Sequence, residues 1–138
     1  PVGRQAKIDG LIAPYRVATW ASIPASAKDA DGAWYGDYFG VMSFEVNTSV
    51  VKNVPADWKD LLKPEYKGQV ALAGDPTQSN QAISAVWASA IANGGSLDNA
   101  APGLDFFKQL NDAGTFVPVI GKTATFASGE TPIRLACT

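Results

Sequence analysis

Residues 74–80 read GDPTQSN and bring together one carboxylate, two hydroxyls and two amide side chains. Groups of these kinds can hold a small solute by hydrogen bonds, and a glycine at the start of the turn allows close backbone approach. A helix that follows such a turn adds backbone N–H groups that have no partner within the helix. The sequence therefore predicts a hydrogen-bonding cradle formed by Asp75, Thr77, Gln78, Ser79 and Asn80.

Other interpretations of the same turn stay open. Ser79 or Thr77 could serve only to cap the helix, with Asp75 and Pro76 making the turn. The turn lacks the Gly-Lys pair, followed by Ser or Thr, that a nucleotide-binding P-loop requires. An enzyme using Asp75 as a base or nucleophile would need a partner base, and none is visible. The chain has no histidine, so we predict no catalytic residue, metal site or cofactor.

Composition limits the classes of partner. The net charge is -2 and the basic residues are scattered singly along the chain, so we expect no nucleic-acid binding. No apolar run approaches the roughly 18 to 20 residues that cross a bilayer, so we expect no direct membrane insertion. The single cysteine, Cys137, cannot form an internal disulfide.

The elements on either side of the turn are clear in the sequence. A buried strand is predicted over residues 69–73, and a helix begins after Ser79 and ends at Gly94 and Gly95. Its predicted inner face comprises Ala82, Ile83, Val86, Trp87, Ala90 and Ile91. In an open α/β sheet, ligands gather beyond the carboxyl ends of strands, which is where this turn lies.

The rest of the chain alternates between predicted strands and helices. A second helix should start at Pro102, turn Leu104, Phe107 and Leu110 inward, and end at Gly114. The other expected elements are a helix ending at Ala13-Pro14, a loop over 19–38, a short helix over 57–62, a strand over 116–120, a short helix and turn over 121–130, and a strand over 131–135. Strands separated by helix-length segments predict an α/β fold with a mainly parallel sheet and helices on both faces.

Several stretches together resemble one protein family. They are PADWKDLLKPEYKGQVALAGDPTQSNQA, GGSLDNAAPGLDFFKQL and SGETPI, with GLIAPY, KDADGAWYGDYFGV and VNTSVV upstream. This set, in this order and over nearly the whole chain, resembles the extracellular solute-binding proteins of bacterial ABC importers, in the cluster with iron(III)-, thiamine- and polyamine-type binders.

The resemblance implies one lobe of a type II periplasmic-binding-protein-like fold. Family members have two α/β lobes and trap solute in the cleft by hinge closure. Residues 1–40 would be the tail of the first lobe with its aromatic loop, residues 41–53 a hinge-like crossing strand, and residues 54–138 a truncated second lobe. The chain would thus be a single-lobe fragment. The resemblance also adds Trp34 and Tyr35 to the ligand contacts, stacking on a planar or cationic solute.

The function implied is capture of a small solute and its delivery to ABC permease subunits, without catalysis. The protein would be periplasmic or extracellular, and its full-length parent could carry a lipoprotein anchor. Apolar surface left by a missing lobe could support a homodimer. The alternative hypothesis is a metabolite-sensing effector domain of a transcription regulator, which shares this fold type.

Overall fold

The computed structural model describes residues 2–138 in two compact units, one ending at Phe39 and one running from Gly40 to Thr138. The second unit holds the turn at 74–80 and all three strands, and it is the larger of the two. Among the described residues, no helix combines the length and apolar character that a membrane span needs.

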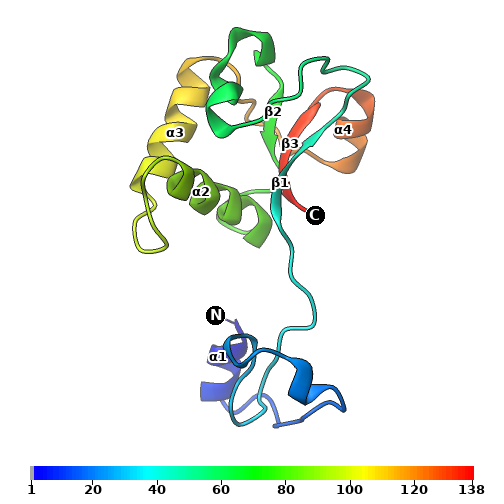
Figure 1. The fold of residues 1–138 in the computed structure, drawn as a ribbon, viewed down its shortest axis with the longest axis vertical. Coiled ribbons are helices and arrows are strands. Elements are labelled where there is room, and N and C mark those ends of the chain that lie inside the picture. Colours follow the sequence, from blue (N-terminus) through cyan, green and yellow to red (C-terminus); the bar gives the residue numbers. More distant parts are fainter. Residues whose placement is uncertain (1) are drawn as a thin grey trace. The chain divides into compact units, whose positions relative to one another are not determined.

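The second unit is built on a three-stranded sheet in the order β1-β3-β2 (Figure 1). The strands are β1 (Met42–Val46), β2 (Val70–Leu72) and β3 (Ile133–Cys137). β3 lies in the centre, antiparallel to β1 and parallel to β2. The sheet is therefore mixed, with one pairing of each kind.

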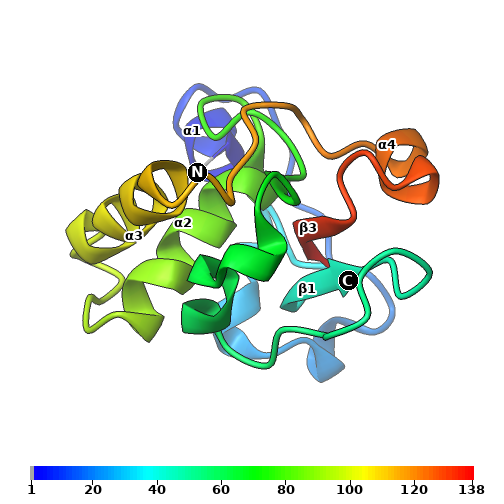
Figure 2. The same ribbon diagram turned by 90° about the horizontal axis from the view of Figure 1, so that it is seen from above.

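Helices cover both faces of this sheet (Figure 2). Helix α2 (Asn80–Ala92) packs against β3 and against α3 (Ala101–Asp112), whereas α4 (Thr123–Ser128) lies on the opposite side. Alternation along β3 explains the two faces, because Leu135 joins the apolar core while Arg134 stacks on Phe126 of α4. The predicted α/β fold class with helices on both faces is confirmed, whereas the predicted mainly parallel sheet is wrong, because β1 pairs with β3 antiparallel.

The core lies between the sheet and the α2–α3 pair. Its fully buried members include Leu61, Val70, Ala82, Ala85, Phe106, Leu110, Ile133 and Leu135. The buried face of α2 consists of small residues, which lets α3 approach closely at Gly103. A Cβ on Gly103 would lie 2.9 Å from both the Ala90 nitrogen and the Ser89 Oγ. The two helices thus pack almost backbone to backbone, which fixes the position of α2 and of the turn before it.

Short 3₁₀ helices complete the second unit. The helix predicted over 57–62 is present as a 3₁₀ helix, Trp58–Leu62, and a second one follows at Pro64–Tyr66. The Asp60 carboxylate accepts hydrogen bonds from the backbone N–H groups of Ala56 and Asp57, at 2.9 and 3.2 Å. These bonds satisfy donors at the helix start that would otherwise have no partner.

The first unit contains α1 (Val2–Ile8) and two 3₁₀ helices, Trp20–Ser22 and Ala25–Ala27. The sequence predicted a helix that continues to Ala13-Pro14, and this prediction is wrong. The helix ends at Ile8 because Gly10 adopts a left-handed conformation, with φ of 67°, and the chain leaves the helical path there.

The predicted strand over residues 116–120 is also wrong. Phe116 forms only an isolated bridge to Val70, and the chain then runs beside β2 without a ladder. Pro118 has no N–H to donate, so a regular strand cannot continue through it. The chain is instead bonded to β2 around the start of this segment, through Thr115 and Val117, and again just after it, through Gly121.

Two predictions of inward-facing residues need correction. Leu104 of α3 is 61% exposed, because Gly103 occupies the position that faces α2. Ile83 and Ile91 of α2 lie on its outer side, at 36% and 52% exposure. The buried stripe of α2 is narrower than predicted and consists of Ala82, Ala85, Val86, Ser89 and Ala90.

Candidate functional site

The turn after β2 is shaped by its own carboxylate. The Asp75 carbonyl accepts hydrogen bonds from the backbone N–H groups of Gln78 and Ser79, at 3.0 and 2.7 Å. The Asp75 side-chain Oδ1 accepts from the Thr77 N–H at 2.8 Å and from the Thr77 hydroxyl at 2.7 Å. Asp75 and Thr77 therefore have a structural role in the turn, as the alternative interpretation of the sequence expected.

These bonds stabilise the charged form of Asp75. The Thr77 hydroxyl, and then the Thr77 N–H, hold the pKa of the Asp75 carboxyl below its usual value of 3.8. A carboxylate with a lowered folded-state pKa stabilises the fold above the unfolded pKa, and the contribution disappears as the pH falls through the lowered value. Asp75 is thus an anion at neutral pH, at the edge of the candidate site.

Replacing Thr77 with valine removes the hydroxyl but keeps the backbone N–H. We expect the pKa of Asp75 to rise toward 3.8, and a carboxyl ¹³C NMR titration measures it directly. Asp112, whose pKa is lowered by Lys108 on α3, serves as the internal control and should not change. An unchanged Asp75 titration in Thr77→Val would show that the hydroxyl is not the cause.

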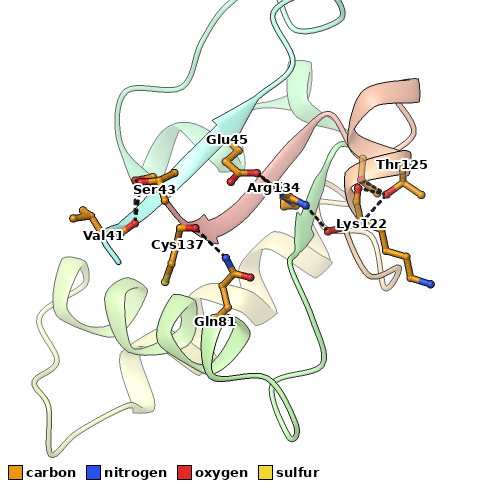
Figure 3. A network of polar contacts seen from close by, with 11 residues as sticks. Val41, Ser43, Glu45, Gln81, Lys122, Thr125, Arg134 and Cys137 are labelled. Carbon is orange, nitrogen blue, oxygen red and sulfur yellow. Dashed lines mark hydrogen bonds and ion pairs between the residues drawn. The ribbon is translucent and has the colours of Figure 1, made fainter. Parts of the chain in front are cut away.

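Ser79 connects the turn to α2. Its Oγ accepts a hydrogen bond from the Ala82 N–H at 3.3 Å, so Ser79 is the N-cap of the helix. Gly74 passes directly over it, since a Cβ on Gly74 would lie 2.6 Å from both the Cβ and Oγ of Ser79. Gln81 fixes the same helix turn to the sheet, because its Nε2 donates to the Cys137 carbonyl at 3.1 Å (Figure 3).

Some donors at this turn stay available. The backbone N–H groups of Asn80 and Gln81 have no acceptor within residues 2–138. Thr77, Gln78 and Asn80 are exposed, so their side chains reach solvent. The turn is therefore open on its outer side, with two backbone donors and two amide side chains that can bind a solute.

A hollow of about 340 Å³ lies beside this turn. Asp75 and Pro76 form one side, with Leu72 and Gly74, and the segment Phe116 to Ile120 forms the other. We call this segment, residues 116–120, the apolar wall. Val119 and Ile120 of the wall are 46% and 45% exposed. The hollow thus combines one carboxylate edge with one apolar side, as small-molecule sites commonly do.

The predicted aromatic contacts, Trp34 and Tyr35, lie in the first unit. Trp34 is half-buried and contacts Gly3 of α1, and Tyr35 packs edge-on against Trp20 with ring centroids 6.1 Å apart. Both line a hollow of about 780 Å³ with Arg4 and Ile8. The two aromatics therefore anchor their own loop while keeping part of each ring at a surface hollow.

The apolar wall was not predicted as a component of the candidate site. Residues 116–120 were predicted to form a strand, although Pro118 was a signal against one. Within residues 2–138, no three His, Cys, Asp or Glu side chains lie close enough to hold a metal ion.

The whole chain, residues 1–138, matches the family described as bacterial extracellular solute-binding protein. The chain belongs to this family. An uncharacterized protein of Haemophilus influenzae is 34% identical over 114 residues, which cover 74% of this chain and 30% of that protein. Of the two hypotheses from the sequence, solute binding is therefore the one that the family supports.

Solved structures agree with this assignment. The periplasmic binding protein P5PA has a TM-score of 0.70 and 25% identity, covering 96% of this chain and 43% of P5PA. AfuA from Actinobacillus pleuropneumoniae, solved with exogenous fructose-6-phosphate bound, has a TM-score of 0.65 and 26% identity over the same shares of the two chains. This solute-binding protein chain thus spans less than half the length of the relatives it matches.

Proposed function

We propose that this chain supplies a solute-contacting lobe of a periplasmic or extracellular binding protein that serves an ABC importer. The protein would capture a small solute between two lobes and deliver it to permease subunits. The family match and the likeness to P5PA and AfuA support this proposal. The proposal includes no catalytic step.

One observation carries the proposal. The turn at 74–80 is open on its outer side, with the N–H groups of Asn80 and Gln81 unpartnered within residues 2–138, and its first residues, Gly74 to Pro76, border a hollow. Hydrogen-bond donors at a helix start suit oxygen atoms of a small polar solute. The exposed side chains of Gln78 and Asn80 would add donors and acceptors, and Ser79 would contribute by holding the helix start in place.

The rest of the chain has a place in this proposal. Residues 1–40 would end the first lobe, with Trp34 and Tyr35 contacting solute, residues 41–53 would cross between lobes, and residues 54–138 would form the second lobe. Self-association through exposed lobe surface and a lipoprotein anchor on the full-length parent are further parts of the proposal.

A thermal-shift screen of the complete two-lobed protein tests this function. The panel contains sugar phosphates, sugars, polyamines, amino acids, thiamine and phosphate, and it starts with fructose-6-phosphate because AfuA holds that compound. We expect one class to raise Tm, since a ligand at 100 times its Kd adds about 2.7 kcal/mol of stability.

Asp105→Ala, an exposed change on α3, is the control and should respond as the wild type does. A panel in which no compound shifts Tm, at concentrations up to about 1 mM, on the order of a thousand times a micromolar Kd, would contradict the proposal.

A further inference from the structure

The apolar wall of the hollow is attached to the sheet only near its two ends. At one end the Val117 N–H donates to the Val70 carbonyl at 2.8 Å, and just past the other the Gly121 N–H donates to the Leu72 carbonyl at 2.8 Å. Pro118, Val119 and Ile120 make no backbone hydrogen bond within residues 2–138. The near end is held further by the Thr115 carbonyl, which accepts from the Val70 N–H at 3.0 Å, whereas the far end is held to the sheet through Gly121.

Gly121 is held from a second side by Arg134 of β3. The Arg134 Nη1 donates to the Gly121 carbonyl at 3.3 Å. The arginine stem covers the same residue, because a Cβ on Gly121 would lie 3.1 Å from the Arg134 Cγ and 3.3 Å from the Ala71 Cβ. Gly121 is buried between β2 and the arginine, so the two strands clamp it from both sides.

Arg134 is itself fixed in place. Its Nε donates to the Glu45 Oε2 at 2.6 Å, its Nη2 also contacts that oxygen, and Glu45 is its register partner on β1 (Figure 3). The guanidinium lies over the Phe126 ring of α4, 5.5 Å from the centroid. Both charged side chains are mostly shielded, with 17% and 22% of their surface exposed. A planar guanidinium can make these contacts at once, which a lysine ammonium cannot.

We propose that Arg134 is a positioning residue for solute binding, holding the apolar wall against the hollow through Gly121 without touching the solute. The inference rests on the proposed function of the hollow. Arg134 is not among the residues that line the hollow, so any effect on affinity must pass through Gly121 and the wall. Because Glu45 anchors the arginine, the wall is also tied to β1.

Amide hydrogen exchange measured by NMR tests the clamp without any solute. In Arg134→Lys, which keeps a charge for Glu45, we expect the Gly121 N–H to exchange about tenfold faster, the change expected when a hydrogen bond from a charged donor is lost. The core N–H of Leu135 reports global opening and should change less. If the exchange rates of the Gly121 and Leu135 N–H groups rise by the same factor in Arg134→Lys, the proposal would be overturned.

Two further variants distinguish loss of the clamp from a general loss of folding. Glu45→Gln combined with Arg134→Met leaves no unpaired buried charge and should loosen Gly121 in the same way. Lys108→Met removes the exposed Lys108–Asp112 ion pair on α3, with side chains 74% and 59% exposed, and should leave Gly121 exchange unchanged.

Affinity is measured separately with the compound that the thermal-shift screen identifies. We expect Arg134→Lys to raise Kd by about tenfold while Lys108→Met leaves it unchanged, following the same loss of one charged hydrogen bond. Faster Gly121 exchange with an unchanged Kd would overturn the positioning role. If no compound binds the wild type, the proposed function fails and the positioning role fails with it, whereas the exchange experiment still decides whether the clamp exists.

Discussion

Replacing Leu110 with alanine is expected to lower the free energy of unfolding by about 2 to 5 kcal/mol. Leu110 is fully buried on α3, in the core with Phe106 and Leu61. Its carbonyl also accepts hydrogen bonds from the Thr115 N–H and hydroxyl, at 3.0 and 3.2 Å, so the helix end around it is well fixed. A cavity there cannot close easily, because the surrounding groups are held by the sheet and by α2.

Leu104→Ala on the same helix is the matched control. Leu104 is 61% exposed, and we expect a change of about 0.5 kcal/mol or less, which is typical of surface substitutions. Chemical denaturation of both variants, analysed with a common m-value, measures the difference. Equal losses of stability in the two variants would contradict the described orientation of α3.

Replacing Gly74 with alanine is expected to disturb both the fold and solute binding. The new Cβ would lie 2.6 Å from the Cβ and Oγ of Ser79, so the serine must move and its bond to the Ala82 N–H is lost. We expect a loss of about 1 to 3 kcal/mol in stability, as for other overpacked sites. Solute affinity should fall by about tenfold or more, because the helix start and its free N–H groups shift with Ser79.

A second substitution tests whether the steric clash between the new Cβ at position 74 and the Ser79 side chain causes these losses. Ser79→Gly removes the two atoms that the alanine would strike, and glycine at an N-cap costs only a few tenths of a kcal/mol. The Gly74→Ala, Ser79→Gly double variant should therefore recover most of the stability lost in Gly74→Ala, measured by denaturation. Gly36→Ala, where the nearest heavy atom would lie 3.5 Å away, is the control and should be neutral. No recovery in the double variant would show that the close approach is not the cause.

The helix next to the candidate site could be predicted because the residues at its two ends signal where a helix starts and stops. Ser79 is the N-cap and Gly94, with φ of 87°, follows the last turn, as the sequence pattern indicated. The strand β2 was also predicted, and a strand was predicted two residues before the bounds of β3, since short apolar runs between turn residues are typical of buried strands. These signals depend on neighbours in the sequence and need no knowledge of tertiary contacts.

Features that depend on distant contacts could not be predicted. Leu104 faces solvent because Gly103 packs against α2, and no local pattern shows which face of α3 meets that helix. The apolar wall was mistaken for a strand because Val119 and Ile120 look like core residues, yet they border a hollow. The link from Glu45 to Arg134 joins residues 89 positions apart, so only the fold reveals it.

The candidate site was predicted in part. The turn at 74–80 lies open at the carboxyl end of β2, in line with the general rule for α/β sheets. The division of roles within it was not visible, because Asp75 and Thr77 bond to each other while Gln78 and Asn80 reach solvent. Contact of these residues with solute stays a prediction, as does contact by Trp34 and Tyr35.

Calorimetric titration of the Ser79→Ala, Asn80→Ala double variant of the complete two-lobed protein tests the central claim most directly. The titrant is the compound that the thermal-shift screen identifies, and Asp105→Ala with Gln109→Ala, at exposed positions of α3 in the same unit, is the control. We predict that Kd rises by about tenfold or more in the first variant, because the helix start loses its cap and one contact, and stays unchanged in the control. A folded double variant that binds with the affinity of the wild type would contradict solute binding at the turn.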